Sequence, residues 1–304
     1  MKYLFFDIDG TLVSHEKGLI PSAKEAIEKT RKKGNKVFIS TGRHLGSLFS
    51  LEDLEVDGII YCNGGGIYID GKIVLQREIP HDICSRTVFL AEERDGRYSL
   101  MSDYKLFKNK KEMDFFKSHS FQDERFASAE EKMKCFGAYP FTEFRYEPIL
   151  KIDIGFDTEE IMADFEKHMP SDLQLASTAG YHIELGKRSG EITRKGVNKG
   201  TAIQEVMKYY NGSMEDTYGF GDSSNDLEML QMCHVGIAMG NAFDEVKNII
   251  CADVRNPIFI RALESSRRAI KSHSPGENLL RYLLYQMNNK IIKAQRQLIT
   301  NDKL

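Results

Sequence analysis

The sequence predicts a doubly wound α/β protein: a parallel-sheet core with a second, α+β domain inserted into it. Short apolar runs that end in acidic or Gly-containing turns lie near the start of the chain and again after about residue 190, as buried parallel strands do. Between these parts the strand over 150–156 alternates between apolar and polar residues, as a half-exposed strand does. We therefore expect the core to span 1–79 and 187–272 and the insert to span 80–186.

The composition of the 304-residue chain is ordinary for a globular protein, with 41% hydrophobic and 29% charged residues. A net charge of −3 gives no support to nucleic-acid binding through a global basic field. The five cysteines are scattered and form no C-x-x-C pair, which argues against a disulfide framework or a structural zinc. The first residues do not resemble a signal peptide, and no stretch approaches the ~18 apolar residues of a membrane span. We expect a cytoplasmic protein with neither nucleic-acid nor membrane partners.

The first strand leads directly into two carboxylates. The apolar run Tyr3–Phe6 is followed by Asp7, Asp9, Gly10 and Thr11. Residues i and i+2 of a strand point to the same side, so Asp7 and Asp9 should converge at its carboxyl end, where open α/β sheets bind ligands. An Asp-x-Asp pair alone is most often a solvated turn, but two converging carboxylates repel each other unless a cation or a shared proton relieves them. The string predicts a Mg²⁺ site in which one carboxylate can also be a nucleophile.

The next strand ends in residues that suit a phosphate. A helix that begins with Pro21 separates the first strand from Lys36–Ser40, and this βαβ unit should place the two strands side by side and parallel. Hydroxyl and backbone N–H groups at a strand-to-helix turn can hold a phosphate oxygen, although a turn with a solvated Arg is the ordinary alternative. The residues concerned are Ser40, Thr41, Gly42 and Arg43.

A third strand, Gly58–Cys62, runs into Asn63 and Gly64. The Gly run that starts there is either a flexible bend or a place where the backbone comes close to a ligand. A β-hairpin with an Asp70-Gly71 turn should follow.

The secondary structure of the insert is harder to predict, and the segment 109–146 shows no clear helical or strand periodicity. Two glutamates, Glu184 and Glu191, lie near its end. One of them could face a substrate, although an exposed Glu at a strand end is the commoner situation. The elements expected here are helices over 81–93 and 158–168 and strands over 97–101, 150–156, 173–176 and 181–185.

After the insert the parallel-sheet pattern returns. Lys199 lies at the start of a helix that runs to Tyr209, and a strand over 216–220 is followed by Asp222, Asn225 and Asp226. Asp222 and Asp226 are four residues apart at a helix start and so share one face. Each of these three residues also has an ordinary explanation. Lys199 could be a solvated lysine, Asp222 an N-cap, and Asp226 a carboxylate that compensates the helix dipole. One more strand and turn occupy 235–242.

Five motifs in this order resemble the Cof-type branch (subfamily IIB) of the haloacid dehalogenase superfamily, a group of phosphotransferases that form an aspartyl-phosphate. They are Asp-x-Asp-Gly-Thr near residue 10, Thr-Gly-Arg near 42, Asn-Gly-Gly near 64, Lys-Gly at 199, and Gly-Asp-x-x-Asn-Asp-x-x-Met-Leu from 221. The match is specific in the core, whereas the insert matches only in position and size. The resemblance implies a Rossmann-like core and an α/β cap that selects the substrate.

The resemblance also implies a role for each matching residue. Asp7 would be the nucleophile, and Asp9 would protonate the leaving alcohol and then deprotonate the attacking water. Mg²⁺ would be held by Asp7, Asp222 and the backbone carbonyl of Asp9. Thr41, Lys199 and Asn225 would bind the phosphoryl oxygens, and Asp226 would hold Lys199 or a metal-bound water. The supporting residues would be Gly10, Thr11, Ser40, Gly42, Arg43, Asn63 and Gly64.

These roles predict a Mg²⁺-dependent phosphatase for a small phosphate monoester, such as a sugar phosphate. The superfamily's dehalogenases lack the second Asp of the first motif, so Asp9 favours phosphate-ester hydrolysis. A phosphomutase is the alternative enzyme and would need a bisphosphate activator. A catalytically silent protein that senses a phosphorylated metabolite is the alternative from another class.

The end of the chain, 273–304, has the pattern of an amphipathic helix. Docking on its own core, a homodimer formed through this helix and binding to an anionic surface are the three interpretations. Its apolar positions are spaced by threes and fours: Leu280, Leu283, Leu284, Met287, Ile291, Ala294 and Leu298.

Overall fold

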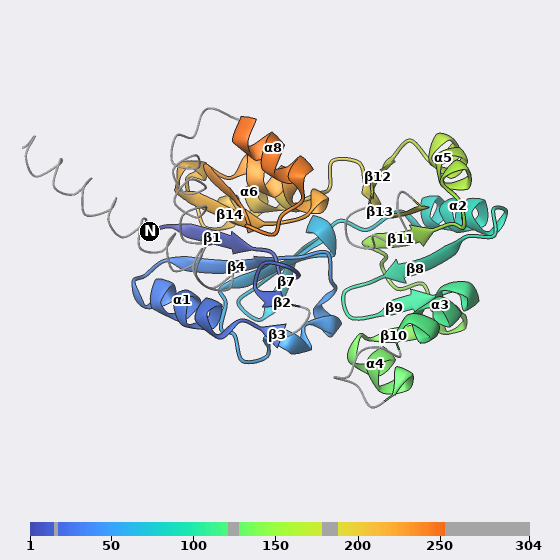
Figure 1. Cartoon of the computed structure of the whole chain (residues 1–304), viewed down its shortest axis with the longest axis horizontal. Coiled ribbons are helices and arrows are strands. Elements are labelled where there is room, and N and C mark those ends of the chain that lie inside the picture. The colour runs from blue at the N-terminus through green and yellow to red at the C-terminus, as the bar shows by residue number, and fades with distance from the viewer. Residues whose placement is uncertain (15–17, 121–127, 178–187, 253–304) are drawn as a thin grey trace, which may run out of the picture.

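The computed structural model describes residues 1–14, 18–120, 128–177 and 188–252, which form two lobes (Figure 1). In this part of the chain the larger sheet has seven strands, in the order β15-β14-β1-β4-β5-β6-β7. The first five in that order are mutually parallel, and β6 and β7 complete the sheet as an antiparallel hairpin. The strands are β1 (Tyr3–Phe6), β4 (Lys36–Ser40), β5 (Gly58–Tyr61), β6 (Gly66–Ile69), β7 (Lys72–Gln76), β14 (Thr217–Gly221) and β15 (Val235–Ala238).

Strand β1 is the centre of this lobe, which we call the core. All four of its residues are buried, and it pairs with β14 on one side and β4 on the other. The rings of Phe5 and Phe38 stack at 5.0 Å, and those of Phe6 and Phe220 at 4.3 Å. Helix α1 (Pro21–Lys32) covers one face of the sheet and α6 (Lys199–Tyr209) the other (Figure 1), α7 (Leu227–Met232) packs on α6, and α8 (Asp244–Ala252) packs on β15 and α7. The predicted doubly wound core is confirmed.

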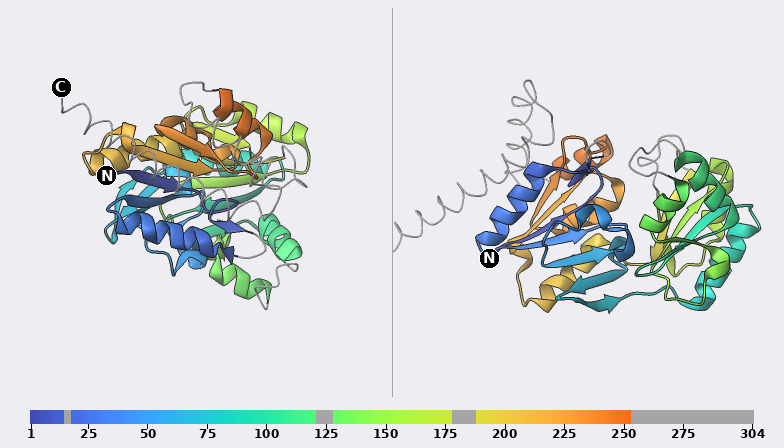
Figure 2. Two further views of the ribbon diagram at one scale, coloured as in Figure 1. Left: turned by 60° about the vertical axis from the view of Figure 1, so that its left-hand side comes forward. Right: turned by 90° about the horizontal axis from the view of Figure 1, so that it is seen from below.

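The second lobe, which we call the cap, contains a sheet of six described strands in the order β10-β9-β8-β11-β13-β12. Apart from the parallel pair β9 and β10, neighbouring strands are antiparallel. Figure 2 shows the cap beside the core. The strands are β8 (Arg97–Met101), β9 (Leu106–Lys108), β10 (Ala138–Pro140), β11 (Lys151–Gly155), β12 (Leu173–Ser177) and β13 (Ser189–Arg194), and the helices are α2 (His81–Glu92), α3 (Lys110–Ser120), α4 (Ala129–Cys135) and α5 (Glu159–His168).

The two faces of the cap sheet differ in polarity because side chains alternate along each strand. Tyr98, Ile152 and Ile192 point to one face and form an apolar core with residues of α2 and α5. Most of the intervening positions carry polar side chains, among them Lys151 and Glu191. This face lies toward the core lobe, where Glu191 contacts Asn63.

The cap is seated on the core through the turn between β8 and β9. The carboxylate of Asp103 accepts hydrogen bonds from the Tyr61 hydroxyl (2.5 Å) and the Gln76 amide (2.7 Å), and its backbone carbonyl accepts one from the Leu45 N–H (2.8 Å). His44 of the core also pairs with the backbone oxygen of Phe136 in the cap, at 2.9 Å. These contacts hold the polar face of the cap sheet over the carboxyl ends of the core strands.

The structure differs from the sequence-based boundaries at the end of the insert. Strand β13 extends the cap sheet to Arg194 by pairing with β11 and β12, so the return to the core follows it instead of beginning at 187. The division into domains otherwise stays a prediction. The charged segment without a clear period contains α3, α4 and β10, and the helix α8 and the small hairpin of β2 (Val13–Ser14) and β3 (Gly18–Leu19) were not predicted. The predicted strand over 181–185, with Glu184, and the C-terminal helix lie outside the described residues.

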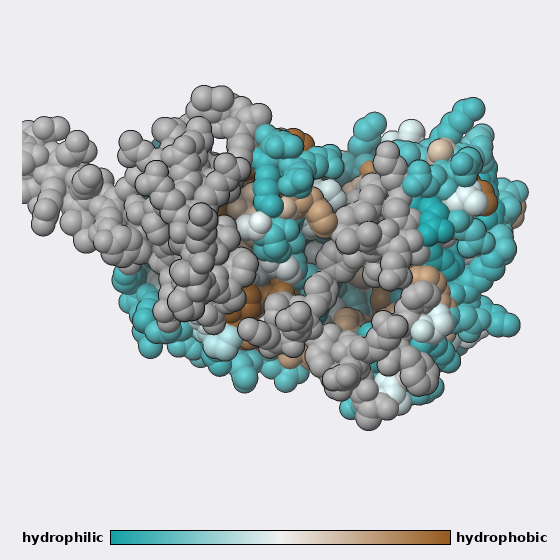
Figure 3. All heavy atoms as spheres, viewed as in Figure 1, coloured by the Kyte–Doolittle hydropathy of each residue, from teal (hydrophilic) through white to brown (hydrophobic). Residues whose placement is uncertain are grey.

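Among the described helices none is long and apolar enough to cross a membrane. The described surface of the cap in the view of Figure 3 is mainly hydrophilic, with scattered apolar side chains.

Candidate active site

Residues from three distant parts of the chain meet at the carboxyl ends of β1 and β14. Asp7 follows β1, Asp222 follows β14, and Lys199 is the first residue of α6. The Lys199 ammonium donates hydrogen bonds to Oδ1 of Asp7 and Oδ1 of Asp226, each at 2.6 Å. Thr11 donates its hydroxyl proton to Oδ1 of Asp222 at 3.1 Å. The structure thus brings the predicted nucleophile, lysine and second metal-binding aspartate into one cluster.

The local sequence fixes Lys199 at this point. Asn198 caps α6: its side chain accepts the N–H of Thr201 at 2.8 Å, and the Thr201 hydroxyl accepts the N–H of Asn198 at 3.2 Å. The Lys199 side chain is fully buried. A buried ammonium persists only when it is paired and hydrogen-bonded, so the solvated-lysine interpretation is wrong.

Asp226 organises the loop after β14. Its Oδ2 accepts the backbone N–H groups of Asp222 (2.9 Å) and Ser223 (3.0 Å), while its Oδ1 pairs with Lys199. Both carboxylate oxygens are therefore engaged with the protein. The resemblance left open whether Asp226 holds Lys199 or a metal-bound water, and the geometry favours Lys199.

Gly10 leaves room for the carboxylate of Asp222. Its φ is +83°, a conformation that costs a residue with a side chain about 1–2 kcal/mol, and a Cβ built on it would lie 2.3 Å from Oδ2 of Asp222. The Asn241 amide donates to the backbone oxygen of Gly10 at 2.9 Å. Two independent reasons, backbone conformation and space, therefore require glycine here.

The carboxylates of this cluster are electrostatically strained. Burial raises the pKa of Asp7 well above its ordinary value, and the Asp226 carboxylate adds to this while Lys199 opposes it. Burial, followed by Asp226, raises the pKa of Asp222 to about 7. Burial alone would lower the pKa of Lys199, but Asp226 and Asp7 outweigh it and raise that pKa. One ammonium does not neutralise three carboxylates, so the site favours a further positive charge.

The donor set fits a small divalent cation. Carboxylate oxygens of Asp7, Asp222 and Asp226 lie within 4.8 Å of one another, and hard oxygen ligands suit Mg²⁺. Because Asp226 is already held by Lys199 and two N–H groups, Asp7 and Asp222 are the carboxylates best able to coordinate an ion. The predicted set also contained the backbone carbonyl of Asp9, and that part stays a prediction.

Arg43 contacts both carboxylate oxygens of Asp9. Its Nε donates to Oδ2 at 2.8 Å and its Nη2 to Oδ1 at 2.5 Å. The Arg43 side chain is 19% exposed and lies over the Phe136 ring of the cap, with 5.8 Å from its guanidinium carbon to the ring centre. The interpretation of a solvated arginine is wrong, because the guanidinium is packed between the first motif and the cap.

The turn after β4 lies in the same region. Thr41 is buried; its N–H donates to the backbone oxygen of Ile60 (2.9 Å), and its hydroxyl accepts the N–H of Arg43 (3.1 Å). The hydroxyl of Ser40 is buried and has no hydrogen-bond partner among the described residues. Ser40 and Thr41 follow Ile39, which pairs with Phe6 just before the first motif, and the phosphate-binding role of Thr41 stays a prediction.

The turn after β5 is tied to the cap. Asn63 and Gly64 belong to a short 3-10 helix (Cys62–Gly64) in which Asn63 has a φ of 53°. The Asn63 amide donates to Oε2 of Glu191 at 2.8 Å, and the Asn225 amide donates to the same oxygen at 3.3 Å. Glu191 is only 13% exposed and also pairs with Lys151.

For Glu191, therefore, the expectation of an exposed strand-end residue is wrong. A signal was present in the sequence: Ile192 is apolar and points to the helix-covered face, so its neighbour had to point to the opposite face. That this opposite face lies against the core was not readable from the sequence.

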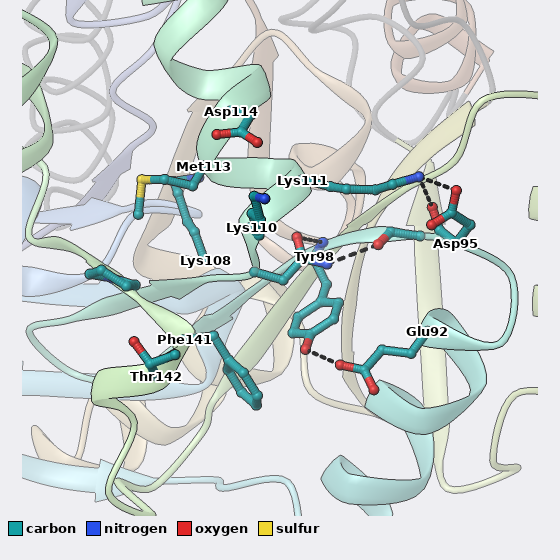
Figure 4. A pocket seen from close by; sticks show the side chains of 13 residues that line it. Glu92, Asp95, Tyr98, Lys108, Lys110, Lys111, Met113, Asp114, Phe141 and Thr142 are labelled. Carbon is teal, nitrogen blue, oxygen red and sulfur yellow. Dashed lines mark hydrogen bonds and ion pairs between the residues drawn. The ribbon is translucent and has the colours of Figure 1, made fainter.

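A cavity of about 520 Å³ lies elsewhere, between α2, β8, α3 and the segment around Phe141 (Figure 4). None of the predicted site residues lines it. Its charged side chains include pairs within the cap, such as Lys111 with Asp95, and the Tyr98 hydroxyl donates to Glu92 at 2.7 Å. We assign no chemistry to this cavity.

Fold and site together define the class of protein. Residues 4–253 match the family model of haloacid dehalogenase-like hydrolases, and the chain belongs to this family. The expected resemblance to subfamily IIB and the expectation of a phosphatase of this family are confirmed.

Among curated relatives, the chain is similar to the pyridoxal phosphate phosphatase YbhA of Escherichia coli (strain K12), with 27% identity over 83% of this chain and 93% of that protein. It is also similar to the 5-amino-6-(5-phospho-D-ribitylamino)uracil phosphatase YwtE of Bacillus subtilis (strain 168), with 29% identity over 81% of this chain and 90% of that protein. Among solved structures, the subclass IIB sugar phosphatase BT4131 matches with a TM-score of 0.67 and 25% identity, covering 84% of this chain and 96% of that one.

Proposed function

We propose that this protein is a Mg²⁺-dependent phosphatase that hydrolyses a small phosphate monoester through an aspartyl-phosphate. The observation that carries the proposal is the buried contact of Lys199 with both Asp7 and Asp226, beside Asp222. Phosphoryl transfer needs a positioned nucleophile, positive charge around the transferred group and a proton shuttle, and the cluster offers a residue for each.

In the first step Oδ of Asp7 attacks phosphorus, and the bond from phosphorus to the leaving oxygen breaks. Lys199, Thr41 and Asn225 hold the phosphoryl oxygens and stabilise their negative charge. The leaving oxygen takes a proton from the carboxyl group of Asp9. Arg43 contacts both Asp9 oxygens in this structure, so it must release at least one of them for this step.

In the second step a water attacks the phosphorus of the aspartyl-phosphate. Asp9 accepts the proton of this water, and the bond between Asp7 and phosphorus breaks. Inorganic phosphate leaves and both aspartates return to their starting states. Mg²⁺, held by Asp7, Asp222 and the Asp9 carbonyl, would neutralise charge on the phosphoryl group and relieve the repulsion between the carboxylates.

The cap supports a polar leaving group. Its core-facing side carries the charged side chains Lys151, Asp153 and Glu191, and a polar face of this kind suits a leaving group with hydroxyl groups better than an apolar one. The relatives act, by name, on pyridoxal phosphate, on a ribitylaminouracil phosphate and on sugar phosphates, and a sugar phosphate or related metabolite is our proposed substrate. The cytoplasmic location and a homodimer through the C-terminal helix stay predictions.

The test is phosphate release from a panel of phosphate monoesters, with Mg²⁺ and with EDTA, for wild type and Asp7→Asn. We expect release that requires Mg²⁺ and is lost in the variant, and the ranking of substrates would indicate the leaving group. Absence of release from wild type would count against the phosphatase, and absence of an isomerised phosphate ester in the presence of a bisphosphate activator would count against the mutase.

A further inference from the structure

Glu191 is a cap residue whose carboxylate is shared between the cap and the predicted phosphate site. Its Oε1 pairs with Lys151 on the neighbouring cap strand β11. Its Oε2 accepts hydrogen bonds from two core amides, Asn63 at 2.8 Å and Asn225 at 3.3 Å. Every carboxylate oxygen is therefore engaged, one with the cap and the other with the core.

The two amides lie against the turn that carries Thr41. The N–H of Asn63 donates to the backbone oxygen of Thr41 at 3.0 Å. A Cβ built on Gly42 would lie 3.0 Å from Oδ1 of Asn63 and 3.2 Å from Oε1 of Glu191. Glu191 thus packs directly on the phosphate-binding turn, with no residue between them.

The side-chain amide of Asn225 is oriented by hydrogen bonds at both its oxygen and its nitrogen. Its Oδ1 accepts the hydroxyl of Ser223 at 2.9 Å, and its Nδ2 donates to Glu191 and to Oδ1 of Asn63, both at 3.3 Å. Since Asn225 is the amide assigned to the phosphoryl group, removal of Glu191 would leave its Nδ2 with the Asn63 contact alone among these bonds.

The backbone at Asn63 also needs a restraint. Cys62 and Asn63 both have left-handed φ values, 50° and 53°. Such residues are strained and persist only where the surroundings over-determine them. The 2.8 Å bond from Asn63 to Glu191 is one of these restraints.

A carboxylate beside a phosphate site is unfavourable unless its charge is balanced. The Lys151 side chain, 3% exposed, supplies the balance. Burial raises the pKa of Glu191, but Lys151 and the Asn63 amide outweigh it and hold that pKa below its ordinary value. Glu191 therefore stays an ionised acceptor, and its charge is partly offset by Lys151, which also contacts Asp153 at 3.0 Å.

We propose that Glu191 is a positioning residue of the phosphate site, through which the cap strand β13 holds the amides of Asn63 and Asn225 in place for the phosphoryl group. The proposal rests on the proposed phosphatase function. It makes phosphate affinity depend on the seating of the cap, because Glu191 belongs to the cap and its two amide partners to the core.

The test compares two charge-neutral double variants. Lys151→Met with Glu191→Gln keeps an acceptor oxygen at position 191, whereas Lys151→Met with Glu191→Leu removes it at similar volume. Both double variants lose the ion pair between positions 151 and 191, so the comparison isolates the side-chain oxygen at position 191. Glu55→Gln is the matched control, since Glu55 is 88% exposed and pairs with Arg31 in the core.

The readouts are Kd for inorganic phosphate by calorimetry in Mg²⁺, inhibition by orthovanadate, the separate values of KM and kcat, and Tm. We expect the Leu variant to bind phosphate about tenfold or more weakly than the Gln variant, because it leaves buried amide donors without their acceptor. The control should match wild type. Equal phosphate affinity of the Gln and Leu variants would overturn the proposal.

If the double variants do not fold, Asn63→Gly decides the question. Glycine accepts the left-handed backbone but removes the donor to Glu191, and we expect phosphate binding to weaken about tenfold; unchanged binding would overturn the proposal. If the wild type hydrolyses esters but the Gln and Leu double variants bind phosphate equally well, only the role of Glu191 is refuted. A wild type that neither hydrolyses esters nor binds phosphate would refute the phosphatase, and the role of Glu191 with it.

Discussion

The ammonium of Lys199 and the carboxylate of Asp7 are 2.6 Å apart, although 192 residues separate them in the chain. The contact joins the start of α6 to the end of β1, and the side chains of both residues are buried. It places a fixed positive charge beside the residue that we propose as the nucleophile.

Replacement of Lys199 by Met should lower kcat by about 100-fold or more, because a preorganised charge on the transferring group is lost. The same change leaves three buried carboxylates without their cation, so Tm without Mg²⁺ should fall. Lys208→Met, at an exposed position of the same helix (71% exposed), should change neither value. Steady-state kinetics and thermal melts would check this, and a Lys199→Met protein with wild-type kcat would contradict the proposed role.

Asp7→Asn should have no measurable turnover and yet be more stable than wild type in EDTA. Burial, and then repulsion from Asp226, raise the pKa of Asp7 well above its ordinary value, so ionised Asp7 destabilises the metal-free fold at neutral pH. A neutral amide of the same shape removes this cost. Thermal melts at pH 7.5 would measure it, and a lower Tm for the variant would show that Lys199 outweighs the repulsion.

The stability of the metal-free protein should depend on pH through Asp222. Its pKa is raised from 3.8 to about 7 in the fold, so the folded state binds the proton more tightly than the unfolded chain. The stabilisation is fully present below about pH 4 and is lost as the pH rises through about 7. The Tm of Asp222→Asn minus that of wild type should therefore grow between pH 4.5 and 7.5.

Mg²⁺ at pH 7.5 should reduce this difference, because the cation stabilises the ionised form of the wild-type carboxylate. Melting curves in EDTA and in Mg²⁺ would measure both effects. Parallel pH profiles for the two proteins would contradict the assignment.

Gly10→Ala should abolish Mg²⁺-dependent turnover while the protein still folds. A Cβ at this position would meet Oδ2 of Asp222 at 2.3 Å, and φ is +83°, so the second metal-binding carboxylate must move. The measurement is kcat as a function of Mg²⁺ concentration, supported by circular dichroism. Gly34→Ala is a suitable control, since Gly34 has a φ of +80° but nothing within 4 Å of its Cβ position; similar losses in both variants would show that only backbone strain matters.

Asp103→Ala should loosen the cap. The variant loses the acceptor of the Tyr61 hydroxyl (2.5 Å) and of the Gln76 amide (2.7 Å), and a buried hydroxyl without its acceptor costs about 1–3 kcal/mol. We expect faster proteolysis between the lobes and a higher KM. Unchanged proteolysis and KM would show that His44 and Glu191 suffice to seat the cap.

The sequence alone determined the core fold and most of the site because these depend on local pattern. Short segments rich in apolar residues placed β1, β4, β5 and β14, and strand connectivity placed their carboxyl ends at one edge. Asp7, Asp222 and Lys199 could be predicted together since each follows a strand or begins a helix at that edge.

Only the tertiary structure decided how the charged side chains pair. Asp226 pairs with Lys199 and two N–H groups, and Arg43 forms an ion pair with Asp9. Glu191 is buried against Asn63, which lies 128 residues away in the chain. Each of these contacts depends on how the fold brings distant elements together. The length of the cap sheet was misjudged for the same reason, since strand pairing and not local composition extends β13 to Arg194. Local sequence sets which way a side chain points, whereas its partner is set by which element the fold brings opposite to it.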